Sequence, residues 1–218
     1  MPSYYPIYLD IKERACVVIG GGGEAERKVT SLLECGGKVT VVSPEVTVGI
    51  QDLASRGLID WISKGYEVGD LEGAFLAVAE NDNPKVYREV AWEAQRKNIL
   101  LNVVDVTELC SFISPAVARR GEVAFAITTG GLSPALARRL REELEESSVM
   151  RWAEMADMIA EVRLEVRGKG LRPDAERWQE CMDEEMLDLY ESGRRDRAKD
   201  RLLRMLQEEP STTSEVLP

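Results

Sequence analysis

The stretch that decides the fold is residues 15–25, ACVVIGGGGEA. Residues 15–19 are all apolar, which is typical of a parallel strand buried on both faces. From residue 25 to residue 35 apolar side chains recur at helical spacing, and Gly36-Gly37 ends that pattern. Residues 38–43 (KVTVVS) are typical of another strand. The stretch therefore predicts a strand, a glycine turn, a helix and a returning parallel strand.

The glycine turn has the pattern of a dinucleotide site. Residues 20–25 match G-x-G-x-x-G/A, with Ala25 in the third position. In this pattern Gly20 permits the tight turn, Gly22 lets the backbone approach a pyrophosphate, and Ala25 keeps the helix close to the sheet. Gly23 and Glu24 open the helix, whose free N–H groups and positive dipole end attract phosphate. A purely structural turn is the alternative, but a run of glycines carries an entropic cost that a ligand would explain.

The adenosine ribose is expected near the end of the second strand, about 20 residues beyond the glycines. Ser43, Pro44 and Glu45 stand there. The Ser43 hydroxyl suits a hydrogen bond to the ribose, and the Glu45 carboxylate lies two residues further on. Because a nearby carboxylate repels a 2′-phosphate, these residues favour NAD over NADP as the cofactor.

Strand and helix patterns alternate through the first half of the chain. Strands are expected at residues 5–9, 58–62, 74–79 and 99–104, and a helix at residues 83–97. Strands that alternate with helices predict right-handed crossovers and a parallel sheet. We therefore expect an α/β fold, with a Rossmann-type parallel sheet over residues 1–114.

Beyond residue 114 the pattern changes. A strand is expected at residues 122–128 and a helix at residues 134–147, with Ser133 as its N-cap and Pro134 in its first position. Further helices are expected at residues 149–167, 173–192 and 194–208. The domains expected are residues 1–114, 115–148 and 149–208, and residues 209–218 form a Ser/Thr/Pro-rich tail with the composition of a disordered segment.

Composition narrows the classes of function. The 218 residues carry 28 basic and 39 acidic side chains, a net charge of −11, which argues against nucleic-acid binding. Histidine is absent, so any acid–base chemistry falls to other side chains, and we expect no metal site. The 4 cysteines have no metal-site spacing and are expected to be small buried hydrophobes in a reducing compartment. With no membrane-length apolar run and no signal peptide, a cytoplasmic protein is expected.

Two further motifs join the glycine turn. Residues 102–105 (NVVD) end the last strand of the first half, and residues 128–138 (TTGGLSPALAR) open the helix that starts at Pro134. Together with VVIGGGGEAERK, these motifs resemble the precorrin-2 dehydrogenase / sirohydrochlorin ferrochelatase family, the siroheme-synthase module, over about residues 3–148. The resemblance implies NAD-dependent oxidation of precorrin-2 to sirohydrochlorin. It leaves open whether the chain also inserts ferrous or cobaltous ion.

The resemblance assigns roles to the ends of the strands. Asp105 ends the NVVD strand, where the family places an aspartate that is important for the chemistry, and a carboxylate is a natural proton acceptor in a chain without histidine. Because Glu108 follows three residues later, Asp105 also fits a helix-capping box, and both roles stay open. Asn81 and Asn102 are expected to face the cofactor. Glu80 departs from the family's usual sequence after the fourth strand.

The second motif suits an anionic substrate. Precorrin-2 is a polycarboxylate, and the Gly130-Gly131 turn and the Ser133 helix start would present backbone donors to it. Thr129 stands where the family has a substrate-side hydroxyl, and Arg138 is the favoured cationic partner. The resemblance also implies a homodimer formed through residues 115–148.

The sequence leaves two alternative functions. One is a regulatory module that senses NAD(H) and acts through its helical tail, which would leave the NVVD and TTGG motifs without a role. The other is a chelatase with a degenerate cofactor site, which the intact glycine pattern argues against.

Overall fold

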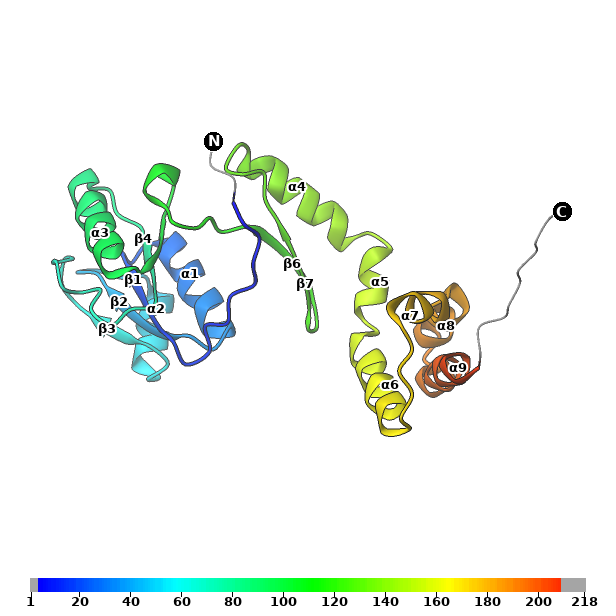
Figure 1. Ribbon diagram of the computed structural model, residues 1–218. Helices are drawn as coiled ribbons and strands as arrows, with labels where there is room; N and C mark the ends of the chain where they lie inside the picture. Colours follow the sequence, from blue (N-terminus) through cyan, green and yellow to red (C-terminus); the bar gives the residue numbers. More distant parts are fainter. Residues whose placement is uncertain (1–3, 209–218) are drawn as a thin grey trace. The chain divides into compact units, whose positions relative to one another are not determined.

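The computed structural model describes residues 4–208, which divide into two compact units (Figure 1). The first unit extends to Ser114 and includes Gly130–Leu132, and the second comprises Pro115–Thr129 and continues from Ser133. The tail expected over residues 209–218 lies outside the described residues. The three-domain division at residues 114 and 148 stays a prediction.

The first unit is built on a five-stranded parallel sheet. Its strands are β1 (Ala15–Ile19), β2 (Lys38–Val42), β3 (Asp60–Ile62), β4 (Leu76–Ala79) and β5 (Leu100–Val103). Their order across the sheet is β3-β2-β1-β4-β5, so the chain reverses direction across the sheet between β1 and β4. In doubly wound folds ligands bind at that reversal, beyond the carboxyl ends of the strands. The predicted Rossmann-type α/β fold is confirmed.

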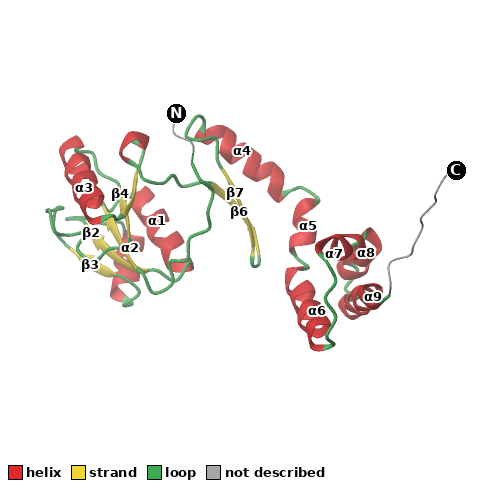
Figure 2. Cartoon of the chain, viewed as in Figure 1, coloured by secondary structure: helices red, strands yellow, loops and turns green. Residues whose placement is uncertain are grey.

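Helices cover both faces of the sheet (Figure 2). They are α1 (Gly23–Glu34), α2 (Val48–Ser55) and α3 (Pro84–Lys97). Alternate side chains of β1 point to opposite faces, so Cys16 and Val18 pack with α1 and α2, whereas Val17 and Ile19 pack with α3. Apolar side chains therefore fill both faces of the sheet, and polar groups that could bind a ligand lie at the ends of the strands.

The second unit joins a hairpin to a set of helices. Strands β6 (Ala116–Arg120) and β7 (Val123–Ile127) pair antiparallel, and α4 packs on β6. The helices are α4 (Pro134–Glu145), α5 (Val149–Ala153), α6 (Ala156–Gly168), α7 (Ala175–Cys181), α8 (Glu184–Glu191) and α9 (Arg195–Gln207). Buried methionines and leucines of α6, α8 and α9 form a separate core.

Several expected elements differ in the structure. Residues 5–9 form no strand, because they pair with no other strand and Tyr5 is 86% exposed. The expected helices 149–167 and 173–192 are each divided in two, and Asp183 caps the second half of the latter by accepting from Met186 N at 2.9 Å. The short helix α2 and the strand β6 were not predicted, since neither has a long periodic pattern.

The cysteines are all free, but their environments differ. Cys16 and Cys181 are buried, as expected, and Cys110 is half-buried. Cys35 is exposed, which corrects the expectation of a buried residue, because it lies at the C-cap of α1 rather than on its packed face. Separately, no helix in residues 4–208 is long and apolar enough to cross a membrane.

Candidate functional site

The glycine turn after β1 leaves no room for side chains at its first two positions. Gly20 has φ +122°, and a Cβ there would lie 2.0 Å from the Glu80 carbonyl oxygen. A Cβ on Gly21 would lie 2.1 Å from the Glu45 carbonyl oxygen. The ends of β2 and β4 therefore close directly onto the turn, as the predicted tight turn at Gly20 requires.

The beginning of α1 has a different character. A Cβ on Gly23 would meet nothing within 4 Å, whereas Ala25 is fully buried against the sheet. Glu24 forms ion pairs with Arg27 and Lys28. The hydrogen bond from Arg27 lowers the pKa of Glu24, and burial lowers the pKa of Lys28. The charge of Glu24 is therefore balanced locally.

The Glu80 carboxylate lies on the N-terminus of α1. Its Oε2 accepts hydrogen bonds from Gly22 N at 3.1 Å and from Ala25 N at 3.0 Å. A Cβ on Gly22 would lie 2.9 Å from the same oxygen. The backbone donors that the sequence pattern assigns to a pyrophosphate are thus engaged by a side chain of this chain.

At the end of β2 the expected ribose-side residues form a tight turn. The Ser43 hydroxyl donates to the Glu45 carbonyl at 2.6 Å, and the Pro44 carbonyl accepts from Ser63 Oγ at 3.2 Å. The Glu45 side chain is exposed and makes no hydrogen bond or ion pair with another described residue. Of these groups, the Glu45 carboxylate is thus available to a ribose without breaking an internal contact.

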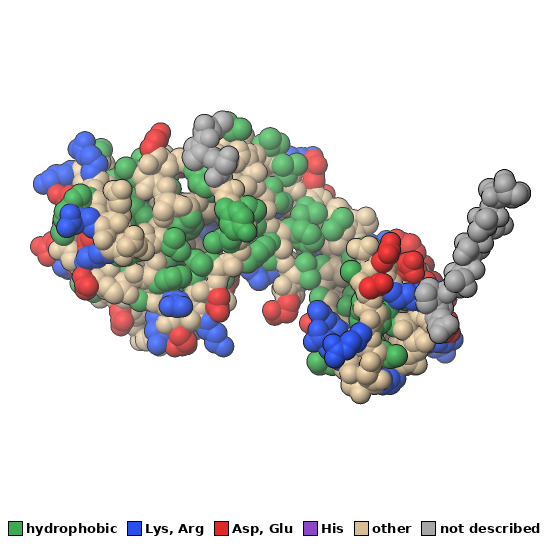
Figure 3. Space-filling view, in the orientation of Figure 1, with side chains coloured by type: hydrophobic (Ala, Val, Ile, Leu, Met, Phe, Trp, Pro, Cys, Tyr) green, Lys and Arg blue, Asp and Glu red, His purple; other side chains and the backbone are tan. Residues whose placement is uncertain are grey.

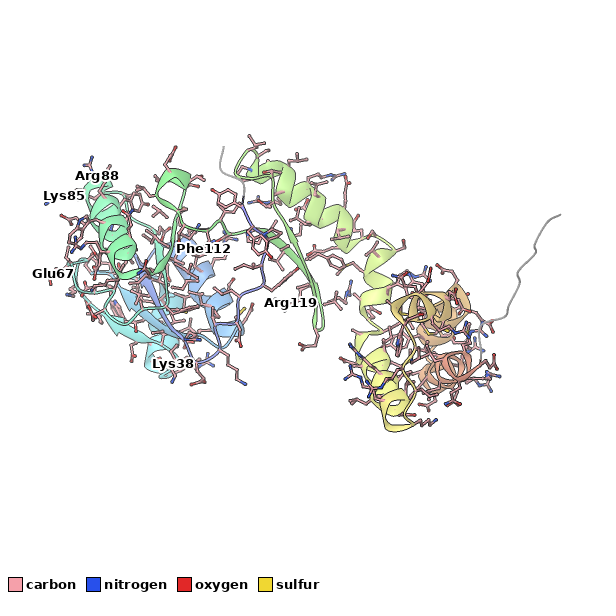
Figure 4. The ribbon with its side chains drawn as sticks, viewed as in Figure 1. Lys38, Glu67, Lys85, Arg88, Phe112 and Arg119 are labelled. Carbon is pink, nitrogen blue, oxygen red and sulfur yellow. The ribbon has the colours of Figure 1, made fainter. Side chains whose placement is uncertain are left out.

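The two asparagines at neighbouring strand ends are both held internally. Asn81 Oδ1 accepts from Asn83 N at 2.9 Å, and its own N–H donates to the Tyr87 hydroxyl at 2.8 Å. The buried Asn102 amide donates to the Phe112 carbonyl at 3.2 Å, and the segment that Phe112 belongs to follows β5 (Figure 4). Both side chains shape the edge of the sheet, and their contact with a cofactor stays a prediction.

Asp105 lies just beyond β5, with an uncommon backbone conformation and an exposed side chain. Its φ is +59°, a left-handed conformation in which non-glycine residues are uncommon, and its side chain is exposed. Its carboxylate has no hydrogen bond or ion pair with another described residue. The 3₁₀ helix η1 (Thr107–Leu109) begins after Val106 with no side-chain cap, so the capping role left open for Asp105 is wrong.

The Gly130-Gly131 turn belongs to the same unit as Asp105. Gly130 and Gly131 have φ of +65° and +87°, and a Cβ on Gly131 would lie 3.7 Å from Thr107 Cγ2. The turn therefore lies against η1, two residues past Asp105 along the chain. This contact was not predicted, since nothing local in the sequence pairs Thr107 with Gly131.

In the second unit, Thr129 and Ser133 organise the start of α4. Ser133 N donates to Thr129 Oγ1 at 3.0 Å, and Leu136 N donates to Ser133 Oγ at 3.2 Å, which confirms Ser133 as the N-cap. Arg138 is exposed and its guanidinium has no partner among the described residues, whereas Arg139 pairs with Glu143. Arg119 lies on the neighbouring strand β6 (Figure 4). On the face drawn in Figure 3, acidic and basic side chains are interspersed over the first unit.

Comparison with known proteins gives the family. A family model described as putative NAD(P)-binding matches residues 7–116, half of the chain. The chain belongs to this family. A second model, described as sirohaem biosynthesis protein central, matches residues 121–147. The resemblance to the siroheme-synthase module is therefore confirmed.

Individual relatives agree with the family. The chain is 34% identical over 209 residues to a siroheme synthase of Thioalkalivibrio sulfidiphilus, which covers 94% of this chain and 42% of that protein. It is 38% identical over 203 residues to a siroheme synthase of Methylococcus capsulatus, covering 92% and 43%. The chain thus spans about two fifths of the length of these relatives. Among solved structures, SirC, a precorrin-2 dehydrogenase, shares the fold with TM-score 0.70 at 24% identity, covering 94% of this chain and 100% of that one.

Proposed function

We propose that this chain binds NAD at the carboxyl edge of its parallel sheet and oxidises precorrin-2 to sirohydrochlorin in siroheme biosynthesis. The activity of the structurally similar SirC and the names of the siroheme synthases to which the chain is similar support this pathway. The observation that carries the proposal is the juxtaposition, within one unit, of the glycine turn and the Asp105 carboxylate, which has no partner among residues 4–208, at the carboxyl edge of the sheet.

The residues present fit NAD. Gly20 and Gly21 let the turn lie against the backbone at the ends of β4 and β2, and the N-terminus of α1 supplies backbone donors. Glu45 offers a carboxylate on the ribose side, which disfavours a 2′-phosphate. The proposed cofactor site is completed by residues of the same turn and of the neighbouring strand ends: Gly22, Gly23, Glu24, Ala25, Ser43, Pro44, Asn81 and Asn102. Bound NAD supplies the hydride acceptor of the reaction.

Asp105 is the proposed base. The oxidation removes a hydride and a proton from the tetrapyrrole, so a single proton acceptor balances the step. The Asp105 carboxylate is exposed and has no partner among residues 4–208, so it can accept that proton without first breaking an ion pair. The left-handed backbone at Asp105 is the kind of local strain that persists where a function requires it.

The polycarboxylate substrate needs cations and donors. We propose that Gly130 and Gly131 present backbone N–H groups to it, with Thr129 and Ser133 fixing that turn. Arg138 is the proposed cationic partner, because its charge is not neutralised by a neighbouring carboxylate among the described residues. In a chain of net charge −11, such an unpaired arginine supplies the locally positive surface that a polyanion requires.

Two further features belong to the proposal. The free cysteines favour a reducing compartment, and we propose a cytoplasmic location. We also propose a homodimer formed through residues 115–148. Its measurement is the mass of the purified protein in solution by light scattering, and a monomer at all concentrations would contradict it.

The test of the function is anaerobic incubation with precorrin-2, with and without NAD, followed by absorbance. We expect the sirohydrochlorin spectrum to appear only when NAD is present. Addition of ferrous or cobaltous ion to the same cuvette then measures chelation separately. If precorrin-2 stays unchanged while NAD still binds, the dehydrogenase proposal fails and a module that senses NAD(H) becomes the better account.

A further inference from the structure

Glu80 makes contacts that the cofactor itself would need. Its Oε2 accepts from both Gly22 N and Ala25 N, at 3.1 and 3.0 Å, on the N-terminus of α1. A phosphate bound at a helix N-terminus uses backbone donors of this kind. A single carboxylate oxygen and a pyrophosphate oxygen cannot both occupy the point where these two N–H groups converge.

The backbone of Glu80 cannot move aside. Glu80 N donates to the Ile19 carbonyl at 2.7 Å, which extends the pairing of β4 with β1, and the Glu80 carbonyl lies against Gly20. The side chain, in contrast, is only half-buried and can rotate about its own bonds. Release of the two donors therefore requires rotation of the Glu80 side chain and no movement of the sheet.

Among the described residues, no cationic side chain pairs with Glu80. Glu24, in the first turn of α1, forms ion pairs with Arg27 and Lys28, whereas Glu80 forms none with any residue of the described chain. A pyrophosphate brought to this turn would meet an unneutralised carboxylate at hydrogen-bonding range. Repulsion at that separation opposes binding even where the geometry of the turn is right.

We propose that Glu80 is a built-in competitor for the pyrophosphate, and that a dinucleotide binds only after this carboxylate has rotated off the N-terminus of α1. This proposal rests on the proposed function in taking NAD as the ligand. The apparent affinity is then lower than the intrinsic one by the fraction of molecules in which Glu80 has left. Because NAD and NADH share the same pyrophosphate, Glu80 weakens the binding of both by the same factor.

The test is calorimetric titration of the full chain with NAD, NADH and ADP-ribose. Glu80→Gln keeps the length of the side chain and removes its charge, and Glu80→Ala removes the competitor altogether. We expect both variants to bind all three ligands about tenfold more tightly than the wild type, since a charge-assisted contact of the carboxylate no longer opposes them. Adenosine, which lacks phosphate, should show no such gain.

Asp82→Asn is the matched control. Asp82 lies two residues further along the same loop, is exposed, and makes no hydrogen bond or ion pair with another described residue. The control removes the same charge from nearly the same place, so we expect its affinities to stay within about twofold of the wild type. Equal gains in Glu80→Gln and Asp82→Asn, or weaker binding in Glu80→Gln, would overturn the proposal.

A second measurement keeps folding apart from binding. Without nucleotide, Glu80→Ala should melt at a lower temperature than the wild type, because two donors of α1 lose their acceptor. With saturating ADP-ribose the order should reverse. If Glu80→Gln binds the dinucleotides more tightly but does not oxidise precorrin-2, the proposed function is contradicted and the role of Glu80 is not. If Glu80→Gln binds them with wild-type affinity and oxidises precorrin-2 normally, the role of Glu80 is contradicted and the proposed function is not. Failure of all variants to bind a dinucleotide would overturn both.

Discussion

The ends of β4 and β5 lie side by side, and each is followed by a carboxylate in a different state. Ala79 and Val103 are partners in the sheet, Glu80 follows the first and Asp105 comes two residues after the second. Glu80 is held by two backbone N–H groups, whereas Asp105 is held by nothing among the described residues. Glu80 therefore contributes to the structure of the turn, whereas Asp105 does not. A held side chain should matter to stability and to ligand entry, and a free one should matter to chemistry.

The largest expected effect is that of Asp105→Asn on turnover. Loss of a positioned general base costs about 10²- to 10⁴-fold in rate, so we expect the rate of precorrin-2 oxidation to fall by that factor. The melting temperature and NAD affinity should not change, because the carboxylate makes no hydrogen bond or ion pair with another residue of the described part of the chain, and asparagine tolerates the left-handed backbone. Stopped-flow absorbance and calorimetry measure the two properties.

Glu108→Gln is the control for that experiment. Glu108 is also exposed and lies in η1, three residues from Asp105. We expect wild-type turnover from it. If Glu108→Gln were as impaired as Asp105→Asn, the general negative charge of this segment would matter rather than the Asp105 carboxylate, and the contrast with Glu80 would lose its meaning.

The close contact between Gly20 and the Glu80 backbone gives the next largest effect. In Gly20→Ala a Cβ would lie 2.0 Å from the Glu80 carbonyl and the residue would keep a left-handed φ, so we expect a loss of about 3 kcal/mol in the free energy of unfolding. Gly23→Ala meets nothing within 4 Å and stands at the first position of α1, so it should stabilise by about 0.5 kcal/mol. Urea unfolding of the two variants measures the difference. Equal losses would show that this turn does not need Gly20 for its close approach.

Most of the sheet could be predicted from local sequence. The run at residues 15–19 is apolar on both faces, and the glycines after it fit only a tight turn into a helix. The short helix α2 (Val48–Ser55) is not predicted from the sequence, because its apolar spacing extends over barely two helical turns. Its N-cap, Thr47, is a weak signal by itself. The strand predicted at residues 5–9 is wrong, because alternating apolar residues form a strand only where a partner strand is present to pair with them.

Contacts at the site depend on long-range packing, and that is where prediction from sequence ended. The sequence marks Glu80 as a departure from the family pattern. Its place on α1 depends on β4 lying next to β1, because Glu80 and Ala25 are 55 residues apart in the sequence. The capping role considered for Asp105 depended on spacing alone, and the structure starts η1 one residue too late for it. Spacing identifies candidates, whereas hydrogen bonds decide which of them are free.

Glu93 extends the comparison to a carboxylate that the fold holds completely. It is 1% exposed and accepts from the Tyr66 hydroxyl at 2.5 Å, from Gly69 N at 3.0 Å and from Lys97 Nζ at 2.6 Å. Burial acts to raise the pKa of Glu93, but the hydrogen bonds from Lys97, Tyr66 and Gly69 outweigh it and lower that pKa. We expect Glu93→Gln to lose about 2 kcal/mol in the free energy of unfolding at pH 7, with turnover per folded molecule unchanged.

The pH dependence of that loss follows from its sign. A carboxylate with a lowered folded pKa contributes its stability above its unfolded pKa of about 4.3, and that contribution is lost as the pH falls through the folded pKa. The gap between wild type and Glu93→Gln should therefore shrink below about pH 4. Glu89→Gln is the control, because the one ion pair of Glu89 among the described residues is a surface pair with Lys85. Urea unfolding at pH 7 and below about pH 4 should find little change in its stability. A gap that stays constant with pH would mean that Glu93 acts through packing and not through its charge.

The smallest expected effect concerns two neighbouring arginines of α4, which repeat the contrast between free and held charges with opposite sign. Arg138 has no partner among the described residues, whereas Arg139 Nε lies 2.8 Å from Glu143 Oε1. A free guanidinium attracts a polycarboxylate with its full charge, and a paired one presents little net charge.

We expect Arg138→Gln to raise KM for precorrin-2 about three- to tenfold with kcat retained, and Arg139→Gln to change it less than twofold. Added salt should raise KM of the wild type toward that of Arg138→Gln, because screening weakens the same interaction. Equal effects of the two substitutions would mean that α4 acts through its total charge, and that an unpaired side chain marks no substrate contact there.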